Sequence, residues 1–512
     1  MATEHAQLDT LEAKGLIRLA NYRPELEYLF RHWLVQDAAY GSLLKQERRE
    51  LHRRVGEALE LLYPERQVEL AAVLALHFEQ AGDTEKALGY LLAAGQYALD
   101  RSAIREAYSA FERARVLLPP TTDGEDDRIR NARIMVELGR ARAGMTFRPA
   151  DDLVADLEVV LPDAERLGDL SLIAPIHLAL ALGRLQSGVQ ASDPVVKRSL
   201  DRVAEIGEEL GDPSLRAMPL ALVGLTQVFM GPLRDGVAAL EEAVPLLQQT
   251  HDSIGAAFAR GALAIGYAQL GEFEKAEQAS RSATELAASG DQIAQLDALI
   301  AEAMLRSELG QLDKAGPLAL ACVNRAEEVG ATACVMPSSW ILGDVYHRQG
   351  RFADARAVLE RGNEISLADD RNFWRPTLTA WLGSAASALG DAAAAEGNWD
   401  EALATARSIG NRFGEAGILR KRAEARATSG NQGEALADFA SSAAELEAEG
   451  ARPGLARLLR GWGEALRATG RGDEANEKLR RSRALFKELG LHAEGQRVGE
   501  LLDDTAAEQA PE

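Results

Sequence analysis

Glycine recurs at a nearly constant interval through the second half of the chain. Successive members of the main series are 39 or 40 residues apart, and a second series lies between them. The main series consists of Gly231, Gly271, Gly310, Gly350, Gly390, Gly430 and Gly470, and the second of Gly211, Gly290, Gly330, Gly410, Gly450 and Gly490. Because glycine readily adopts the left-handed conformation that ends helices, the two series predict a turn about every 20 residues.

Between these turns, apolar residues lie at the spacing of an amphipathic helix. Each repeat thus contains two helices of about 16 residues, which cannot bury their apolar faces alone and must stack on their neighbours. The composition agrees, because 46% of the residues are hydrophobic but only 5% are aromatic, which suits thin alanine-rich helices better than a sheet. The sequence therefore predicts an all-α solenoid with a period of about 40 residues.

Two copies of the repeat share one order of small and aromatic residues around the turn. The clearer copy contains Leu342, Gly343, Tyr346, Gly350, Phe352 and Ala355, and the other contains Tyr267, Gly271, Phe273 and Ala276. This order resembles the tetratricopeptide repeat, although the usual period of that repeat is about 34 residues. HEAT repeats have the longer period without this order of residues, and they remain the alternative.

Polar and acidic segments predict how the chain is divided. The segment PPTTDGEDD (119–127) interrupts the helical pattern and is the best candidate for an acidic linker. Residues 64–118 before it are expected to form the first tetratricopeptide-like helices, and residues 128–502 after it the main solenoid. Residues 503–512 are polar and acidic and are expected to form a disordered tail.

Residues 1–63 differ from the repeats and resemble a different class of proteins. The matching positions are Gly15, Leu16, Ile17, Phe30, His32, Leu34, Asp37, Tyr40, Leu43, Leu44, Arg49, Leu51, His52 and Val55. They resemble the region that follows the winged-helix domain in bacterial signal-transduction ATPases of the STAND class, which include cyclase-linked ATPases and ATP-dependent transcriptional activators. The resemblance implies a winged-helix remnant and a linking helix over residues 1–63.

The same resemblance assigns a role to one histidine. In STAND proteins a winged-helix histidine can sense the phosphates of bound nucleotide, and His32 matches that position. The sequence has no Gly-Lys dipeptide, however, and therefore no GxxxxGK[ST] loop to hold phosphate. His32 would contact a cofactor only if an ATPase domain lay upstream in the same protein. The chain is thus either a free-standing repeat protein or the C-terminal part of a longer ATPase.

Charge and motif content narrow the range of functions. The formal net charge of −22 argues against a general grip on nucleic acid or anionic lipid. The two cysteines suggest a reducing compartment, and the absence of an apolar run of about 18 residues predicts no membrane span. The motifs HExxH, GxSxG and GxGxxG do not occur. We therefore expect a cytoplasmic protein without catalysis, cofactor or metal.

The inner wall of the predicted solenoid is the candidate binding surface, because solenoids bind partners along their concave side. In the tetratricopeptide phase, inward positions lie at fixed offsets before each turn glycine. These positions hold Trp340, Asp344, His347, Arg348, Arg420, Glu424, Arg460, Glu464 and Arg467. Arginine binds carboxylates with paired hydrogen bonds. We therefore expect a protein or peptide partner, with an acidic segment or a C-terminus at the arginine-bearing end and hydrophobic side chains at the apolar end.

The sequence thus predicts a non-catalytic interaction scaffold with a regulatory or signalling role. The alternative is the C-terminal sensor region of a larger STAND ATPase, cyclase-linked or transcriptional, whose nucleotide-binding part is missing from this sequence. A third reading, a transcriptional regulator in its own right, would need a DNA-binding domain, and the N-terminal residues contain no convincing recognition helix.

Overall fold

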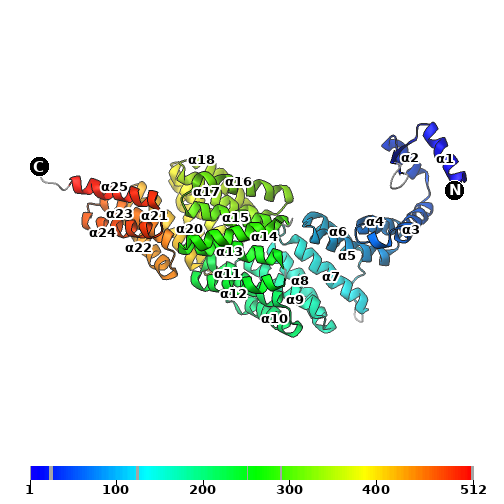
Figure 1. Ribbon diagram of the computed structural model, residues 1–512, viewed down its shortest axis with the longest axis horizontal. Helices are drawn as coiled ribbons and strands as arrows, with labels where there is room; N and C mark the ends of the chain where they lie inside the picture. Colours follow the sequence, from blue (N-terminus) through cyan, green and yellow to red (C-terminus); the bar gives the residue numbers. More distant parts are fainter. Residues whose placement is uncertain (1, 22–26, 123–125, 251, 289–290, 509–512) are drawn as a thin grey trace. The chain divides into compact units, whose positions relative to one another are not determined.

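The computed structural model describes the chain except residues 1, 22–26, 123–125, 251, 289–290 and 509–512. The chain forms two compact units (Figure 1). The first contains Met1–Tyr97 and Ser109–Pro120, and the second contains Ala98–Tyr108 and Thr121–Glu512. The helices α5 and α6 contribute residues to both units.

The first unit combines helices with a short β-hairpin. The strands β1 and β2 pair antiparallel, with Ile17 opposite Phe30. The elements of this part are α1 (Ala2–Ala13), β1 (Ile17–Asn21), β2 (Glu27–Phe30), α2 (Trp33–Ser42), α3 (Lys45–Leu62), the 3-10 helix η1 (Pro64–Arg66), α4 (Ala71–Ala81), α5 (Thr84–Asp100) and α6 (Ile104–Leu117). None of the residues of α2 is buried, whereas α4 buries Leu74 and Phe78 against its neighbours.

The second unit is a series of antiparallel helix pairs, as the glycine spacing predicts. Its helices are α7 (Asp127–Gly144), α8 (Ala150–Leu167), α9 (Leu170–Gln186), α10 (Pro194–Leu210), α11 (Pro213–Met230), α12 (Leu233–Gln249), α13 (Ser253–Leu270), α14 (Phe273–Ala287), α15 (Gln292–Glu308), α16 (Leu312–Val329), α17 (Thr332–Arg348), α18 (Phe352–Ala368), α19 (Arg375–Ala388), α20 (Ala392–Ser408), α21 (Arg412–Thr428), α22 (Gln432–Glu449), α23 (Arg452–Ala468), α24 (Gly472–Glu488) and α25 (His492–Glu508).

The described turn glycines all have a positive φ, but Gly231, with φ of 84° and ψ of 156°, is not in the left-handed helical conformation that the sequence predicts. Among the others, Gly271 follows α13 with φ of 82°, and Gly350 follows α17 with φ of 77°. Gly290 lies outside the described residues. Where the second series has Asp370 in place of glycine, that residue also adopts a positive φ, of 52°.

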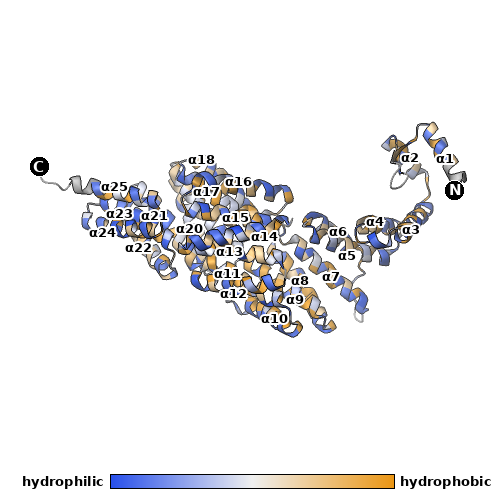
Figure 2. Ribbon diagram, viewed as in Figure 1, coloured by the Kyte–Doolittle hydropathy of each residue, from blue (hydrophilic) through white to orange (hydrophobic). Residues whose placement is uncertain are grey.

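The odd-numbered helices from α11 to α23 form the inner layer of the second unit. Each contacts the next odd-numbered helix as well as its own hairpin partner. The α13 helix is buried almost throughout, because both its faces are covered. Figure 2 shows hydrophobic and hydrophilic residues mixed within the helices, as expected where each helix has a packed side and an exposed side.

The solenoid also contacts itself across long distances in sequence. The helix α11 contacts α21, and α13 contacts α23. Hydrogen bonds also join other distant segments, from Arg371 Nη2, after α18, to the carbonyl of Met145, after α7, at 2.6 Å, and from Gln190 Nε2, after α9, to the carbonyl of Gly410, after α20, at 2.6 Å. These partners are 226 and 220 residues apart. Successive turns of the superhelix therefore pack directly against each other, which the repeat period alone does not predict.

The predicted domain boundaries stay predictions, although several lie close to structural features. One of the three boundaries between the two units follows Pro120, inside the proposed linker 119–127, of which residues 123–125 lie outside the described residues. The helix α25 extends to Glu508, into the segment 503–512 that we expected to be disordered. Residues 509–512 of that segment lie outside the described part of the chain.

Candidate functional site

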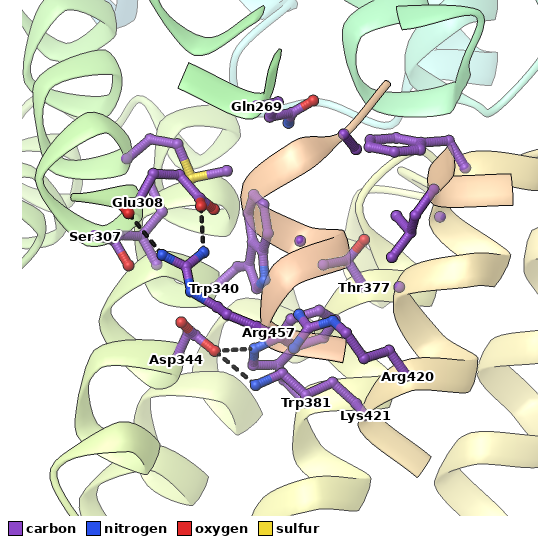
Figure 3. A pocket seen from close by; sticks show the side chains of 18 of the residues that line it. Gln269, Ser307, Glu308, Trp340, Asp344, Thr377, Trp381, Arg420, Lys421 and Arg457 are labelled. Atoms are coloured by element: carbon purple, nitrogen blue, oxygen red, sulfur yellow. Dashed lines mark hydrogen bonds and ion pairs between the residues drawn. The ribbon is translucent and has the colours of Figure 1, made fainter. Parts of the chain in front are cut away.

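A cavity opens on the inner layer of the second unit, where seven odd-numbered helices from α11 to α23 contribute side chains (Figure 3). Its volume is about 200 Å³, and it opens to solvent. This is below the roughly 300–1,000 Å³ of binding cavities for drug-sized molecules, so only part of a peptide ligand fits inside it. The helices on its two sides come from successive superhelical turns, so the cavity exists only when those turns are packed together.

One part of the cavity wall is aromatic. Trp340 of α17 lies between Phe229 of α11 and Trp381 of α19, with ring centroids 6.3 Å and 5.8 Å away and nearly perpendicular planes. Trp374 packs against Phe229 from behind, at 4.8 Å. Edge-to-face contacts of this kind favour a fixed arrangement of the rings. The wall is therefore a preformed apolar surface.

A buried ion pair lies beside this wall. The Oδ1 atom of Asp344 accepts hydrogen bonds from Lys421 Nζ and from Trp381 Nε1, both at 2.9 Å (Figure 3). The Lys421 side chain is 5% exposed and lies over the Trp381 ring at 5.1 Å. Burial alone would raise the pKa of the Asp344 carboxyl, but Lys421 and the nearby Arg348 hold it well below its usual range. Asp344 is thus an anion that positions Lys421 and Trp381.

A second polar cluster joins α15 to α23 and α25. Arg457 donates to the side chain and the main-chain carbonyl of Glu308, and to Glu494 Oε1 at 3.0 Å. Burial alone would lower the pKa of Arg457, but these two carboxylates raise it. Arg348 donates to the carbonyl of Ser307 at 2.9 Å. Each of the three guanidinium nitrogens of Arg457 therefore donates a hydrogen bond across the contact between these helices.

The remaining cations lie between α21 and α23. Arg420 Nη1 donates to Glu424 Oε1 at 2.8 Å within α21. Arg460 of α23 forms a looser ion pair with Glu464, at 3.9 Å, which is beyond hydrogen-bond distance. Burial would raise the pKa of Glu424, but Arg420 and Lys421 lower it. Burial raises the pKa of Glu464. Of these cations, Arg460 has the most capacity to bind a further anion.

Two polar atoms of the cavity lining have no hydrogen-bond partner among the described residues. They are Oε1 of Gln269, on α13, and Nε1 of Trp340, on α17. The Gln269 side chain belongs to a residue that is only 9% exposed. Buried polar groups without a partner are uncommon in folded proteins and call for an explanation.

The structure brings most of the residues expected on the inner wall into one place. Six line this cavity, and they are Trp340, Asp344, Arg348, Arg420, Glu424 and Arg460. Glu464 lines a neighbouring groove between α21 and α23. That these residues bind a partner stays a prediction.

The other predicted site residues lie elsewhere. His347 packs against Phe352, with ring centroids 5.2 Å apart, and burial lowers its pKa to about 4. Arg467 donates to the main-chain carbonyl of Leu501 in α25. His32 caps α2, with its Nδ1 accepting from the Leu34 amide at 3.2 Å. His347 and Arg467 do not line the described cavity.

Sequence reasoning missed several residues of the cavity, for two reasons. Gln269 lies two residues before Gly271, and Ser307 and Glu308 lie three and two residues before Gly310. The predicted inward residues before Gly350 lie at the same offsets, so applying these offsets to the two earlier repeats would have found all three. Trp381 and Lys421 lie at a different offset, and no sequence signal distinguishes them from ordinary helix positions. Arg457 reaches the cavity only because successive turns are in contact.

Two further properties concern metals and membranes. No group of three or more His, Cys, Asp or Glu side chains among the described residues is placed to hold a metal ion. Within the same part of the chain, no helix has both the length and the apolar character that crossing a membrane requires.

Comparisons with known proteins identify the repeats. The tetratricopeptide repeat model matches residues 257–282, 337–361 and 383–408. These matches include both copies that show the small-and-aromatic order. The chain therefore contains tetratricopeptide repeats, and its fold is an all-α solenoid of that type rather than a HEAT array.

Relatives in sequence are distant. An uncharacterized protein of Rhizobium meliloti (strain 1021) is 29% identical over 151 residues. The match covers 29% of this chain and 15% of that protein, so it spans a small part of a much longer relative.

Comparison with solved structures gives matches at low sequence identity. A Rap protein in complex with Competence and Sporulation Factor has a TM-score of 0.53 and 14% identity, over 71% of this chain and 99% of that chain. A STAND protein with a tetratricopeptide repeat sensor from Pyrococcus horikoshii has a TM-score of 0.41 and 13% identity, over 89% of this chain and 75% of that chain.

Proposed function

We propose that the second unit binds a protein or peptide segment in the cavity between α11 and α23, and acts as a non-catalytic regulatory scaffold in the cytoplasm. The segment presents a carboxylate to Arg460 and an apolar side chain to the aromatic wall around Trp340. The carboxylate belongs to an acidic side chain or to a C-terminus. The Rap protein of similar fold, which was solved in complex with Competence and Sporulation Factor, is an example of a helical solenoid that holds a ligand.

One observation carries this proposal. The same cavity combines a preformed aromatic wall with Arg460, whose described ion pair, with Glu464, is 3.9 Å long. The other cations of the cavity are already engaged: Lys421 with Asp344, Arg420 with Glu424, Arg457 with Glu308, and Arg348 with the carbonyl of Ser307. An incoming carboxylate can therefore bind Arg460 without first breaking a short internal ion pair.

Reversing the charge of Arg460 should abolish most of the binding. The probe is an array of random five-residue peptides with free C-termini, compared with the same array with carboxamide C-termini. We expect Arg460→Glu to weaken binding of carboxylate-bearing peptides by roughly 10- to 100-fold, because a hydrogen bond to a charged group contributes about 1.5–3 kcal/mol.

Arg480→Glu is the matched control, since it makes the same charge change at an exposed position of α24. It should leave binding unchanged, and circular dichroism should show both variants folded. Equal affinity of wild type and Arg460→Glu for the selected peptides, or no selection of peptides by the wild type, would overturn the proposal.

A second candidate function follows from the first unit. This unit exposes several large apolar side chains, among them Trp33 at 67%, Leu44 at 70% and Leu61 at 80%. Exposed apolar surface of this extent commonly marks a contact with another protein part. We propose as the alternative that residues 1–63 are a winged-helix remnant that packs against the nucleotide-binding part of a larger STAND ATPase, with the solenoid as its sensor.

The mass of the native protein in its own cells tests this alternative. An antibody to the solenoid should detect a species much heavier than 55.2 kDa on a denaturing gel if the alternative holds, because the ATPase would be on the same chain. A species near 55.2 kDa would contradict it and leave the free-standing scaffold.

A further inference from the structure

We infer that the group that enters the cavity is a planar aromatic ring that carries a carboxylate, with the ring on the aromatic wall and the carboxylate on Arg460. Free aromatic acids and a C-terminal aromatic residue share this chemistry. The inference rests on the proposed function, because it uses the same contact to Arg460, and it adds the chemical class of the ligand, which that function leaves open.

The size of the cavity limits this group to about one ring. The volume is about 200 Å³, and an engineered apolar cavity of about 150 Å³ in another protein holds a benzene molecule. A ring with one substituent that bears the carboxylate therefore fits inside. Any further part of a longer ligand lies outside the cavity.

The shape of the apolar wall favours a flat ring. Four aromatic side chains line the cavity, and they are Phe229, Trp340, Trp381 and Phe413. The plane of Trp340 is at 88° to that of Trp381 (Figure 3) and at 75° to that of Phe229. Aromatic rings attract one another when they are offset-stacked or edge-to-face, beyond the effect of the area that they bury. A flat ring in such a corner can therefore stack on one side chain and meet the next one edge-on.

The charges of the lining favour an anion. Five cationic side chains and three carboxylates line the cavity, which gives an excess of two positive charges in a chain whose net charge is −22. An ammonium ligand in an aromatic site lies over a ring face, but Lys421 already lies over the Trp381 ring, at 5.1 Å. The cavity therefore suits an aromatic anion better than a cation.

Arg460 is connected to the aromatic wall by a short series of contacts. Lys421 Nζ, over the Trp381 ring, lies 3.9 Å from Glu424 Oε2. The positive charge of Arg460 in turn helps to lower the pKa of Glu424, so the two side chains are near each other. Arg460 holds its own partner Glu464 only at 3.9 Å. A carboxylate attached to a ring on the wall can therefore bind Arg460 within the same cavity.

Gly417 is an independent observation that points to a ligand. It lies inside α21, on the face that also carries Phe413, Lys421 and Glu424, and all four residues line the cavity. A Cβ atom at Gly417 would meet no atom of the described residues within 4 Å. Packing therefore does not require glycine here, although glycine is unfavourable inside a helix. The missing side chain instead leaves part of the cavity open.

The wild-type protein alone tests the chemistry of the ligand. The probes are benzoate, phenylacetate, 3-phenylpropionate and indole-3-acetate, which differ in the distance between ring and carboxylate, and titration calorimetry measures their binding. We expect at least one acid to bind roughly 10- to 100-fold more tightly than its own carboxamide, because the carboxylate binds a guanidinium. The analogue of that acid with a saturated ring should bind roughly 2- to 10-fold more weakly than the acid.

Filling the cavity from Gly417 should remove this binding without unfolding the protein. Gly417→Leu places a side chain in the open space, so we expect the acid to bind at least roughly 10-fold more weakly, with no loss of stability in urea unfolding. Gly397→Leu is the matched control. Gly397 also lies inside a helix, α20, and also has no atom within 4 Å of a Cβ position, but it is exposed. This variant should bind the acid as the wild type does.

The pentapeptide GGGGF with a free C-terminus identifies the source of the group. Its last residue carries the ring and the carboxylate of 3-phenylpropionate at the end of a chain. Tighter binding of this peptide than of any free acid would assign the cavity to a protein C-terminus. Tighter binding of a free acid would assign it to a small molecule. Both outcomes support the inference.

Other outcomes separate the inference from the proposed function. The inference is wrong if neither the acids nor GGGGF bind, if acid and carboxamide bind equally, or if the folded Gly417→Leu variant binds as the wild type does. Should the peptide array still select carboxylate-bearing peptides that depend on Arg460, the proposed function stands without it. If the acids bind as expected but the array selects no peptide, the inference holds and the protein segment of the proposed function is wrong. The comparison of acids with carboxamides decides even if Gly417→Leu does not fold.

Discussion

Replacing Asp344 with alanine should lower the free energy of unfolding by about 3–5 kcal/mol, because it leaves the buried charge of Lys421 with only a looser ion pair to Glu424, at 3.9 Å. Lys421 is 5% exposed and its Nζ lies 2.9 Å from Asp344 Oδ1. Trp381 would lose the acceptor of its indole N–H in the same substitution. Urea unfolding followed by circular dichroism measures the loss.

Asp354→Ala is the matched control for this prediction. Asp354 pairs with Arg351 on the surface of α18, with side chains that are 53% and 51% exposed. An exposed pair of this kind contributes at most about 1 kcal/mol. If Asp344→Ala lowers the free energy of unfolding no more than Asp354→Ala does, the charge of Lys421 is not buried as the structure has it.

The effect of Asp344 should also depend on pH in a defined direction. Its pKa is depressed in the folded protein, so its contribution is fully present above the unfolded value of about 3.9 and is lost as the pH falls towards the folded value. The difference in stability between wild type and Asp344→Ala should therefore be constant near neutral pH and shrink below about pH 4.

Replacing Gly236 with alanine should destabilise the solenoid, although the same change elsewhere should stabilise it. Gly236 lies in α12, where a Cβ atom would come within 2.8 Å of the Gly224 carbonyl oxygen and 2.9 Å of the Val228 amide nitrogen of α11. Both are main-chain atoms and can move away only if the two helices separate. Overpacking of this kind costs about 1–3 kcal/mol, which exceeds the roughly 1 kcal/mol that alanine gains over glycine in a helix.

Gly397→Ala provides the opposite result. Gly397 lies in α20, is exposed, and has no atom within 4 Å of the position that a Cβ would occupy. Alanine should stabilise the protein there by about 0.5–1 kcal/mol through helix propensity alone. Urea unfolding of both variants gives the sign of each change in the free energy of unfolding. A gain in stability for Gly236→Ala would contradict the close packing of α11 on α12.

The repeat architecture could be predicted because it depends on local properties. Turn glycines such as Gly271 and Gly350 must adopt a positive φ wherever a helix ends in this way, and the apolar spacing between them defines which face is buried. The position of Trp340 on the inner layer follows from the same period. Much of the charged wall could be found for that reason, since Arg420 and Arg460 lie ten residues before their turn glycines, as Trp340 does, and Asp344 lies six residues before Gly350.

The partners of those residues could not be predicted in the same way. Lys421 and Asp344 are 77 residues apart, and Arg457 and Glu308 are 149 residues apart. Each pair depends on how far the superhelix rotates with each repeat, which is the sum of small differences in helix packing. Trp340 and Gln269 each have a polar atom without a hydrogen-bond partner among the described residues. This property also depends on the positions of all their neighbours, so the sequence does not predict it.

The sequence by itself thus determined the helices, their turns and the layer to which each residue belongs, because these follow from backbone preference and apolar periodicity over a few residues. Only the tertiary structure decided that successive turns touch, that a cavity lies between them, and which charges inside it are paired. These properties depend on contacts between residues far apart in sequence, such as Lys421 with Asp344, 77 positions away, and no local preference encodes the distance between them.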